Sequence, residues 1–447
     1  MSTVAAISTP YGCGGIAVIR ISGSEAFCIA DKFFVIGNTK RLFDAKANTA
    51  TYGKIIDNDG SVLDYGIATV FRGPHSYTGE DVVEISCHGG IHIAKKVLKR
   101  AVECGATLAL RGEFTKRAFL NGKLDLSQAE GVIDLINSQS DKGAENAVFQ
   151  LEGRLSKSIN EMREKLMRLA AHLQAMIDFP DEGIDELTDS EIAEILNDII
   201  KDIKKMLSTA EYGKIIKEGF PVAVIGKPNV GKSSLLNCLS DSDKAIVTDV
   251  AGTTRDVVEE YINVGGYALK LMDTAGIHNT QDVVEKIGVE KSLKAARESS
   301  LILAVFDLSR SFDDEDKEIL SEIKDKRSLI VLNKADKEIE GYPVSGVRIS
   351  TKTGEGIDDL LNHITDIAEE IKGNNQDDII TNERHIECLL RCCDNLENAY
   401  NSITYGIPFD LISIDVQMAL ESLGEIVGLT VSEEIVDRIF STFCVGK

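Results

Sequence analysis

The sequence lacks any long apolar run, and no stretch approaches the roughly 18 consecutive apolar residues that a membrane-spanning helix needs. Its first residues, MSTVAAISTPYGCGGIAVIR, also lack the basic segment followed by an apolar core that marks a signal peptide. We therefore expect the protein to remain in the compartment in which it is made, the cytoplasm.

Paired cysteine motifs are missing as well. The nine cysteines are scattered, and the closest group, Cys388, Cys392 and Cys393, lies in a stretch with helical periodicity. A structural zinc would be predicted by two CxxC motifs at suitable spacing, which this sequence does not contain. We expect buried, reduced thiols in a reducing compartment.

Basic residues are scarce, with 49 lysines and arginines against 72 aspartates and glutamates, which leaves a formal charge of −23. A protein that grips RNA over a broad surface of its own usually presents a basic face. If this chain acts on nucleic acid, a local basic patch or a basic partner should provide much of the binding. An acidic surface that serves only solubility would produce the same composition.

Proline is rare, with seven residues in 447, and its placement marks three regimes in a chain long enough for two to four domains. The first 120 residues combine glycine-rich turns with short apolar strands at 15–21 and 81–87, which predicts a compact α+β domain. A proline-free stretch follows, and a second helical run spans 189–216. Apolar residues in the proline-free stretch recur at spacings of four and three, which predicts a helical stripe in a bundle core. These residues are Leu155, Ile159, Met162, Leu166, Leu169, Leu173 and Met176.

The pattern changes at Phe220, where short apolar strands alternate with helical segments. This alternation predicts a parallel sheet covered by helices, with strands at 221–226, 268–273, 301–307, 328–333 and 347–350. A polar linker at 373–378 leads back into helices, which we expect to pack on those of 124–216. The predicted parts are 1–120, a helical domain made of 121–217 and 374–447, and an inserted domain at 218–373.

The strand at 221–226 is followed by GKPNVGKS, Gly226 to Ser233, and then by a helix. This matches the phosphate-binding pattern GxxxxGK[ST] in its strand–loop–helix setting. The glycines allow successive backbone N–H groups to point at phosphate oxygens. Lys232 would place its charge on the β- and γ-phosphates, and Ser233 would offer its hydroxyl to Mg²⁺.

Four further motifs follow in the order of a GTP-binding domain: GTTRD (252–256), DTAG (273–276), NKAD (333–336) and STK (350–352). Thr254 would be the second Mg²⁺ ligand, and Asp273 would reach the metal through its coordination shell. The Asp336 carboxylate would accept from guanine N1–H and its 2-amino group, a pair that adenine lacks, which argues against an ATPase. The expected GTP-binding residues are Asn229, Val230, Gly231, Lys232, Ser233, Ser234, Thr248, Asp249, Val250, Ala251, Gly252, Thr253, Thr254, Asp273, Thr274, Ala275, Gly276, Asn333, Lys334, Ala335, Asp336, Ser350, Thr351 and Lys352.

With its flanks, this predicted G domain resembles the MnmE (TrmE) family of tRNA-modification GTPases. The resemblance covers nearly the whole chain, and its most specific blocks lie outside the G motifs. These blocks are GGIAVIRISG, SYTGEDVVEISCHGG (76–90), GEFTKRAFLNGKLDLSQAEGVIDLI (112–136) and the terminal CVGK. The family fold implied is an α+β N-terminal domain and an all-α helical domain interrupted by a Ras-like α/β P-loop GTPase domain.

The resemblance also implies the biochemical setting. GTP hydrolysis would depend on Mg²⁺ and on a K⁺-dependent pairing of G domains. The chain would work in a heterotetramer with the flavoprotein MnmG (GidA) to add a carboxymethylaminomethyl or aminomethyl group at C5 of the wobble uridine of certain tRNAs. The one-carbon unit would come from 5-formyl- or methylene-tetrahydrofolate. The chain would form a homodimer through its N-terminal domain, with the tRNA held largely by the partner.

Several residues match family positions with known roles. Arg20, Glu84 and Lys123 match folate-contacting positions, and the terminal Lys447 would complete that site. Cations suit the glutamate tail of a folate, and a carboxylate suits the amino groups of its pterin. Cys444, near the chain end, would be either a reactive thiol or a packing residue beside the folate.

The other matches concern the nucleotide. Asn229 matches a potassium ligand, and Thr248, Val250 and Thr253 match the switch I positions that complete the ion site. An ion there would neutralise charge between the phosphates, as an arginine finger does in other GTPases. Arg255 is expected to be structural.

Glu285 matches the catalytic glutamate of switch II. Ile277 stands where Ras-type proteins have a glutamine and cannot orient water, whereas Glu285 could do so through a second water. Its neighbours Asp282 and Glu290 leave a plain solvated acidic face as the alternative.

Two other functions remain open from the sequence. A ribosome-assembly switch shares the G domain and the asparagine of the phosphate loop, but it usually carries a basic RNA-binding module. A folate-dependent one-carbon transferase regulated by GTP would work without a flavoprotein. The acidic helical segments and the CVGK terminus favour the tRNA-modifying interpretation.

Overall fold

The computed structural model describes residues 2–37, 41–179, 187–240, 260–272, 299–337, 342–372 and 379–447. The chain divides into two compact units. The first, here called the terminal unit, comprises Met1–Ile133, Leu151–Ile159 and Gly424–Lys447. The second, the central unit, comprises Asp134–Gln150 and Asn160–Leu423. Each unit is described by itself.

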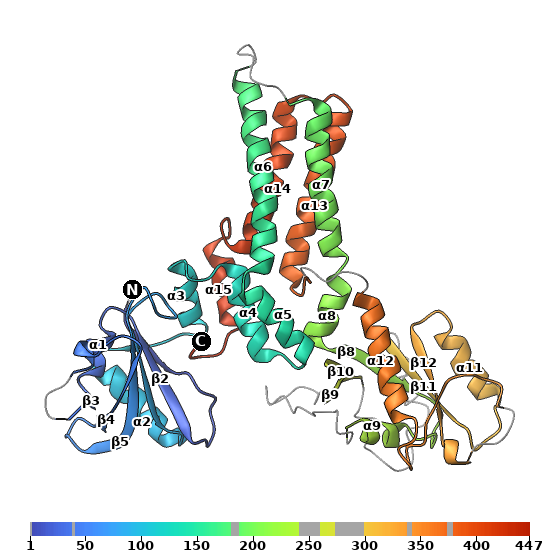
Figure 1. Ribbon diagram of the computed structural model, residues 1–447, viewed down its shortest axis with the longest axis horizontal. Coiled ribbons are helices and arrows are strands. Elements are labelled where there is room, and N and C mark those ends of the chain that lie inside the picture. The colour runs from blue at the N-terminus through green and yellow to red at the C-terminus, as the bar shows by residue number, and fades with distance from the viewer. Residues whose placement is uncertain are drawn as a thin grey trace. The chain divides into compact units, whose positions relative to one another are not determined.

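The terminal unit contains a seven-stranded sheet in the order β3-β4-β5-β6-β2-β1-β7 (Figure 1). Neighbouring strands are antiparallel except β1 and β7, which are parallel. The strands are β1 Val4–Ile7, β2 Ile16–Ser22, β3 Phe34–Val35, β4 Thr49–Ile56, β5 Val62–Phe71, β6 Val82–His88 and β7 Thr107–Leu108.

Alternation along these strands places one face of the sheet in a core. In β2, Ala17, Ile19 and Ile21 are buried while the residues between them are more exposed, as expected for a strand with one covered face. Helix α2 covers that face by packing on β1, β2, β5 and β6. The helical elements of this unit are α1 Ala26–Ala30, η1 Leu42–Asp44, α2 Ile91–Glu103, α3 Glu113–Leu120, α4 Leu126–Asn137, which continues into the central unit, and α15 Glu433–Ser441.

The central unit contains a helical bundle whose long members lie side by side (Figure 1). The predicted apolar stripe lies on α6, where six of its seven residues are buried and Met176 is half-buried. The predicted packing of C-terminal on earlier helices is confirmed for α7 and α13, which Lys204 and Glu397 also join at 2.6 Å. The bundle helices are α5 Asp141–Leu151, α6 Arg154–Asp178, α7 Asp189–Leu207, α13 Glu383–Thr404 and α14 Phe409–Val427, and one end each of α5, α6 and α14 belongs to the terminal unit.

The predicted helical run at 189–216 is wrong in its continuity, because α7 ends at Leu207 and α8 spans Ala210–Glu218. Thr209 lies at the break, and its hydroxyl donates to the carbonyl of Met206. The apolar residues keep their helical spacing on both sides of this break, so the periodicity alone predicts one continuous helix.

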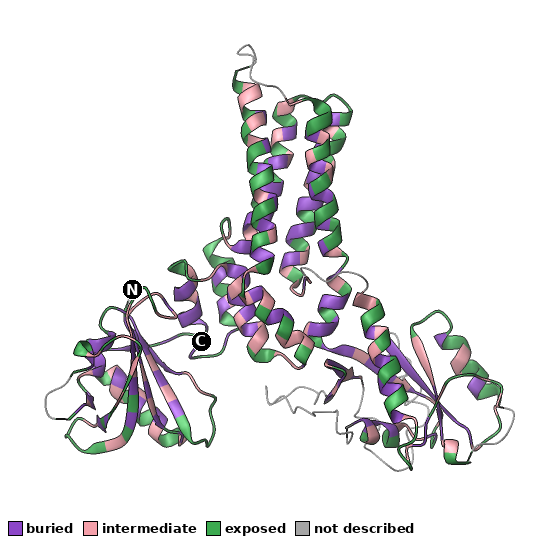
Figure 2. Ribbon diagram, viewed as in Figure 1, coloured by how far each residue is buried: buried purple, intermediate pink, exposed green. Residues whose placement is uncertain are grey.

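The remainder of the central unit is a six-stranded sheet in the order β13-β12-β11-β8-β10-β9. All neighbours are parallel except β9, which pairs antiparallel with β10. Every residue of β11 is buried, as expected for a strand covered on both faces (Figure 2). The strands are β8 Phe220–Ile225, β9 Glu260–Val264, β10 Tyr267–Leu271, β11 Leu301–Asp307, β12 Ser328–Asn333 and β13 Val347–Arg348, and the flanking helical elements are α9 Lys232–Ser240, α11 Asp314–Ile323, η3 Ala335–Lys337 and α12 Ile357–Lys372.

This sheet confirms the predicted α/β P-loop architecture, and it adds an edge strand, β9, that was not predicted. Strand β9 is only five residues long and reads EYINV, so its sequence shows no regular alternation of apolar and polar residues. Among the helices that the structure describes, none is long and apolar enough to span a bilayer.

Candidate functional site

The loop between β8 and α9 curls in the way that a phosphate site requires. Asn229 has φ 63° and Gly231 has φ 103°, both in the left-handed region. A Cβ on Gly231 would lie 2.2 Å from Nδ2 of Asn333, so only glycine fits this position. The curl turns backbone N–H groups inward at the N-terminus of α9, where the helix dipole also favours an anion.

Lys232 begins α9, and its ammonium group folds back over the loop. Its Nζ donates to the carbonyls of Gly226 at 2.7 Å and Lys227 at 2.9 Å. Burial lowers the pKa of Lys232. Contact with two neutral carbonyls compensates a partly desolvated ammonium group less than charged phosphate oxygens would, which favours exchange of these contacts on phosphate binding. Ser233, the next residue, is exposed, so its hydroxyl is accessible to a metal ion at the phosphates.

Asn333 ties the phosphate loop to the two loops that follow β12 and β13. Its side chain is fully buried, and its Nδ2 donates to the carbonyl of Val230 at 2.8 Å. Its Oδ1 accepts from the backbone N–H of Thr351 at 3.2 Å. The first residue of NKAD therefore joins three of the predicted motifs, because one amide group both donates and accepts.

Lys334, the second residue of that motif, has φ 65° and reaches back to the phosphate loop. Its Nζ donates to the carbonyl of Asn229 at 3.0 Å and to Oδ2 of Asp307 at 2.6 Å. Asp307 ends β11, and Ser309 donates to its Oδ1 through both N–H and hydroxyl. Burial would raise the pKa of Asp307, but the hydrogen bonds from Lys334 and Ser309 outweigh it and hold this pKa below its usual value.

Asp307 was not predicted from the sequence. Its position at the carboxyl end of a buried strand could have predicted a place in the site, since ligand sites in open α/β sheets lie at that edge.

Asp336 is exposed, and its Oδ1 accepts from the hydroxyl of Ser350 at 2.8 Å. Ser350 is itself fully buried. The carboxylate is therefore oriented by the adjoining STK loop while it remains open to a base. The structure brings together the predicted residues Asn229 to Ser234, Asn333 to Asp336 and Ser350 to Lys352.

The remaining predicted nucleotide residues lie outside the described residues. They are Thr248, Asp249, Val250, Ala251, Gly252, Thr253, Thr254, Asp273, Thr274, Ala275, Gly276 and Glu285, and the segment also contains Arg255.

A second group of predicted residues meets in the terminal unit. Arg20 on β2 and Glu84 on β6 are directly opposed in the sheet, and their side chains form an ion pair at 2.8 Å. The Arg20 guanidinium also lies 5.3 Å from the ring centre of Tyr77 and 5.4 Å from that of Phe114. Cation–π contact of this kind holds the guanidinium flat against aromatic surface. Neither aromatic residue was predicted, because both are distant from Arg20 in the sequence.

The C-terminal residues complete this group. An N–H of the Arg20 guanidinium donates to the carbonyl of Gly446 at 3.4 Å, and the backbone N–H of Phe114 donates to the carbonyl of Lys447 at 3.2 Å. Burial, with a contribution from the charge of Arg20, lowers the pKa of Lys447. Cys444 is exposed, and its backbone carbonyl accepts from the N–H of Gly112.

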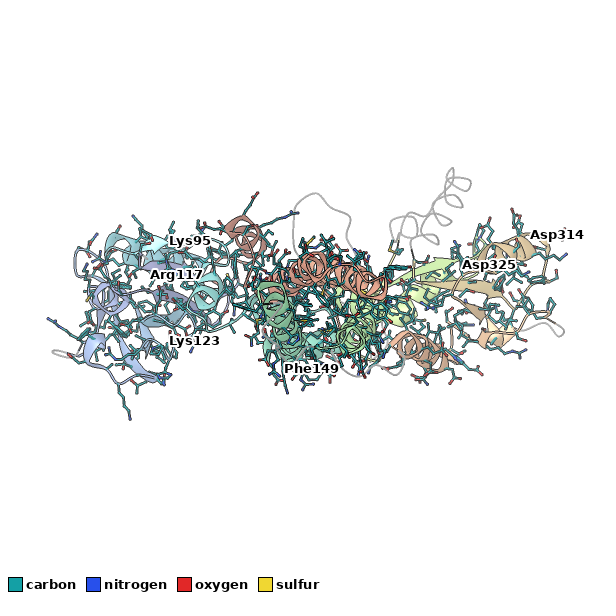
Figure 3. The ribbon with its side chains drawn as sticks, turned by 90° about the horizontal axis from the view of Figure 1, so that it is seen from above. Lys95, Arg117, Lys123, Phe149, Asp314 and Asp325 are labelled. Carbon is teal, nitrogen blue, oxygen red and sulfur yellow. The ribbon has the colours of Figure 1, made fainter. Side chains whose placement is uncertain are left out.

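Lys123 is joined to the same group through the loop at 73–80, which carries Tyr77. Its Nζ donates to the carbonyl of Pro74 at 3.0 Å. Arg117 and Lys123 both lie in the terminal unit (Figure 3).

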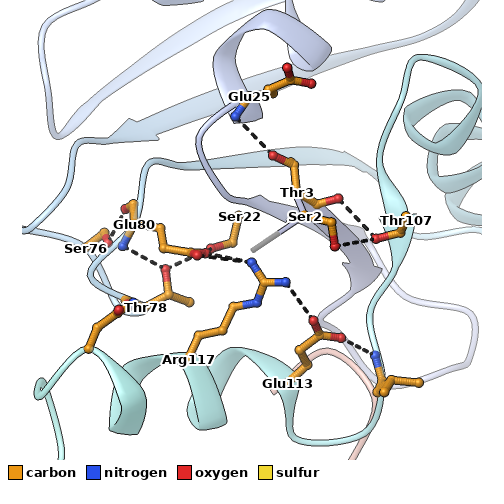
Figure 4. Close-up of polar contacts among 12 residues, drawn as sticks. Ser2, Thr3, Ser22, Glu25, Ser76, Thr78, Glu80, Thr107, Glu113 and Arg117 are labelled. Carbon is orange, nitrogen blue, oxygen red and sulfur yellow. Dashed lines mark hydrogen bonds and ion pairs between the residues drawn. The ribbon is translucent and has the colours of Figure 1, made fainter.

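Arg117 secures that loop to α3. The side chain is only 4% exposed, and it donates to Glu80 at 3.0 and 3.1 Å and to Glu113 at 2.7 Å (Figure 4). The Glu80 carboxylate also accepts from Ser22, two residues beyond Arg20 on β2. Loss of any one partner would leave a buried charge uncompensated, which is energetically costly. The network therefore holds the loop at 73–80, which carries Tyr77, against α3.

The nine cysteines are all free thiols. The expectation that they are buried is wrong for Cys13, Cys28 and Cys444, which are exposed, and Cys238 is half-buried. Small apolar character alone does not bury a cysteine in a loop, near a chain end or, as for Cys28, on the outer side of the short helix α1.

Comparisons with known proteins identify the family of the chain. The family model described as "GTP-binding protein TrmE N-terminus" matches residues 3–123, and the model described as "MnmE helical domain" matches residues 126–444. The tRNA modification GTPase MnmE of Acetivibrio thermocellus is 45% identical over 100% of this chain and 99% of its own length. The MnmE proteins of Clostridioides difficile and Finegoldia magna are each 44% identical, over 100% and 99% of this chain and 99% of their own lengths.

Among solved structures, the G domain of the Thermotoga maritima FeoB iron transporter is 29% identical over 33% of this chain and 98% of its own, with a TM-score of 0.23. The assignment rests on the full-length relatives and on the two family models. The chain belongs to the MnmE (TrmE) family of tRNA modification GTPases.

Proposed function

We propose that this GTPase, with a flavoprotein partner of the MnmG (GidA) type, adds a carboxymethylaminomethyl or aminomethyl group at C5 of the wobble uridine of certain tRNAs. A 5-formyl- or methylene-tetrahydrofolate would provide the one-carbon unit. The observation that carries this proposal is the Arg20 group, in which a guanidinium paired with Glu84 lies against two aromatic rings beside the C-terminal Lys447.

The chemistry of these residues fits a folate. Arg20, Lys123 and Lys447 would meet the carboxylates of its glutamate tail, and Glu84 would accept from the amino groups of the pterin. Tyr77 and Phe114 offer flat apolar surface at the same place. We assign the accessible thiol of Cys444 a role in the reaction at this site rather than in packing, because its side chain is exposed.

The nucleotide site also fits its metal ions. Ser233 and Thr254 would hold Mg²⁺, which supplies charge neutralisation at the phosphates when bound. Asn229, Thr248, Val250 and Thr253 would hold K⁺. Asn229 is exposed at the turn of the phosphate loop, so its amide oxygen is accessible to an ion.

Lys232 would then exchange its contacts with loop carbonyls for phosphate oxygens, and Glu285 would orient the attacking water. Glu285→Ala should keep GTP affinity and lose hydrolysis. An unchanged rate would assign this residue to the solvated acidic face instead.

We further propose a homodimer through the N-terminal domain (residues 1–120), a heterotetramer with the flavoprotein, and a cytoplasmic location in which tRNA is held largely by that partner. The acidic composition of the chain supports the proposal that the partner holds most of the tRNA, since binding RNA over a broad surface requires basic side chains.

The test is nucleoside mass spectrometry of tRNA from cells that contain or lack this protein. Absence of the protein should remove C5-aminomethyl-type wobble uridines, and the wild-type gene should restore them. Arg20→Ala and Cys444→Ser should fail to restore them while the purified variants still hydrolyse GTP, because both changes lie outside the G domain. Unchanged tRNA in the deletion strain would overturn the proposal.

A further inference from the structure

Two segments connect the nucleotide-binding sheet to the helical bundle within the central unit. One is α8, which leads into β8, and the other is the segment after α12 that leads into α13. The two are joined to each other, because the backbone N–H of Ile380 donates to the hydroxyl of Thr209 at 3.0 Å. They also pack closely, since a Cβ on Gly213 would lie 1.9 Å from the carbonyl oxygen of Ile380.

Helix α8 is part of the core beneath the nucleotide-binding sheet. Its residues Tyr212, Ile215 and Ile216 are buried in one cluster with the inner residues of β8, β10 and α12. A displacement of the sheet edge therefore cannot leave α8 in place without opening this packed core.

The β9–β10 hairpin forms the edge of the sheet and contacts both α8 and α12. Tyr267, the first residue of β10, is 1% exposed, and its hydroxyl donates to Oε1 of Glu369 on α12 at 2.6 Å. The hydroxyl of Tyr212 on α8 lies 3.0 Å from that of Tyr267. Because the Tyr267 proton is committed to Glu369, Tyr212 is the donor in this second bond.

Further contacts surround this three-residue chain. Burial, followed by the hydrogen bond to Glu369, raises the pKa of Tyr267, so its hydroxyl stays a neutral donor. Lys372 lies 3.8 Å from the carboxylate of Glu369 and 6.0 Å from the ring centre of Tyr212. The hairpin turn itself reaches the bundle, because the carbonyl of Gly266 accepts from the backbone N–H of Lys142 in the first turn of α5 at 3.1 Å.

In the sequence, the hairpin lies between the GTTRD and DTAG motifs. Strand β9 begins six residues after Thr254, and β10 ends two residues before Asp273. It is thus the described segment that lies between the two motifs expected to respond to the γ-phosphate.

We propose that Tyr212, Tyr267 and Glu369 are positioning residues that couple the nucleotide state of the G domain to the helical bundle. A shift of the β9–β10 hairpin on GTP binding or hydrolysis moves Tyr267, and the hydroxyl chain passes this movement to α8 and α12 together. The hydrogen bond from Lys142 to Gly266 carries the same shift to α5. The consequence for tRNA rests on the proposed function, but the mechanical coupling does not.

The variant Tyr267→Phe removes the shared hydroxyl and keeps the ring that fills the core. Tyr342→Phe is the matched control, since Tyr342 packs edge-on against Phe312 on another part of the same G domain. Hydrogen exchange of the α5 and α8 amides is measured in the GDP and GTP-analogue states of the full chain, together with GTP hydrolysis and melting temperature.

We expect wild type and Tyr342→Phe to show a nucleotide-dependent difference in exchange at the Lys142 amide and along α8. In Tyr267→Phe the difference along α8 should vanish, while the difference at the Lys142 amide remains, because its bond to the Gly266 carbonyl does not use the hydroxyl. GTP hydrolysis should stay within about twofold and tRNA modification should fall about tenfold, as a coupling of 1–3 kcal/mol would give. Tyr212→Phe should behave in the same way.

Two results would overturn the coupling. One is a nucleotide-dependent exchange difference along α8 that persists in Tyr267→Phe. The other is a parallel loss of hydrolysis and melting temperature, which would make the hydroxyl chain a purely structural contact. A wild-type protein that shows the exchange difference but modifies no tRNA would contradict the proposed function and leave the coupling established.

Discussion

At the scale of single residues, Asn333 joins the described loops of the candidate nucleotide site. Its buried amide bonds the phosphate loop on one side and the STK loop on the other, at 2.8 and 3.2 Å. Asp336 follows Asn333 by three residues and accepts a hydrogen bond from Ser350 of the STK loop. The proposed guanine contact of Asp336 therefore depends on the bonds that Asn333 makes between the loops.

We expect Asn333→Ala to weaken GTP binding by about tenfold or more. The change leaves the carbonyl of Val230 and the N–H of Thr351 without their partner, and a buried group left unsatisfied costs about 1–3 kcal/mol. Titration with a fluorescent GTP analogue measures the effect. Asn401→Ala on the exposed surface of α13 is the control, and equal affinities for the two variants would contradict the assignment.

A second prediction at this scale concerns Asn229. If its amide oxygen helps to hold K⁺, GTP turnover should be at least about tenfold faster in KCl than in NaCl of the same ionic strength, since the ion takes the place of an arginine finger. Asn229→Ala should lose most of that difference. Steady-state phosphate release in the two salts tests this, and equal wild-type rates would rule out the potassium site.

At the scale of elements, the uncovered face of the terminal sheet is unusually apolar. Tyr52 on β4 is directly opposed to Ile67 on β5, and they are 67% and 44% exposed. Tyr65, two residues from Ile67, stacks on Tyr52 with ring centres 6.2 Å apart, and Ile16 on β2 is 66% exposed. Several exposed apolar side chains on one sheet face are typical of a protein–protein contact.

We therefore expect Ile67→Glu to convert the proposed homodimer to monomer. A charge at the centre of an apolar contact must be buried without a partner, which costs several kcal/mol. Light scattering after size-exclusion chromatography gives the mass directly. Ile414→Glu on the exposed side of α14 should leave the dimer unchanged, and a dimeric Ile67→Glu variant would show that another surface is used.

At the scale of the whole molecule, the charge of −23 sets how the chain meets its RNA substrate. Electrostatic attraction to phosphates provides most of non-specific RNA affinity, and this chain has an excess of the repelling sign. A partner with a basic surface would provide the missing attraction to the phosphates, and we propose this role for the flavoprotein.

The chain alone should accordingly bind tRNA with a dissociation constant of roughly 10⁻⁵ M or weaker at physiological salt. Addition of the flavoprotein should tighten binding strongly, and the gain should shrink as salt rises. Fluorescence anisotropy of labelled tRNA measures both. Tight binding by the chain alone would mean that a local basic patch on its own surface holds the RNA.

The three described loops of the candidate nucleotide site could be located from the sequence because their motifs are contiguous. A phosphate loop needs consecutive backbone N–H groups with glycine at set places, so Gly226 to Ser233 can be identified without knowledge of the fold. The same holds for NKAD and STK and for the alternation that predicts a parallel sheet. The break at Thr209 and the strand β9 were not predicted, because short elements show too few repeats of a periodic pattern to be recognised.

The sequence by itself thus determined the class of nucleotide, the architecture of the inserted domain and the family. Only the tertiary structure decided which distant residues act together. Arg20 meets Gly446 and Lys447 from the opposite end of the chain, and Tyr77 and Phe114 complete the group. Tyr212, Tyr267 and Glu369 likewise converge from three elements. Such groupings follow from strand register and core packing, which depend on the whole chain and leave no local pattern.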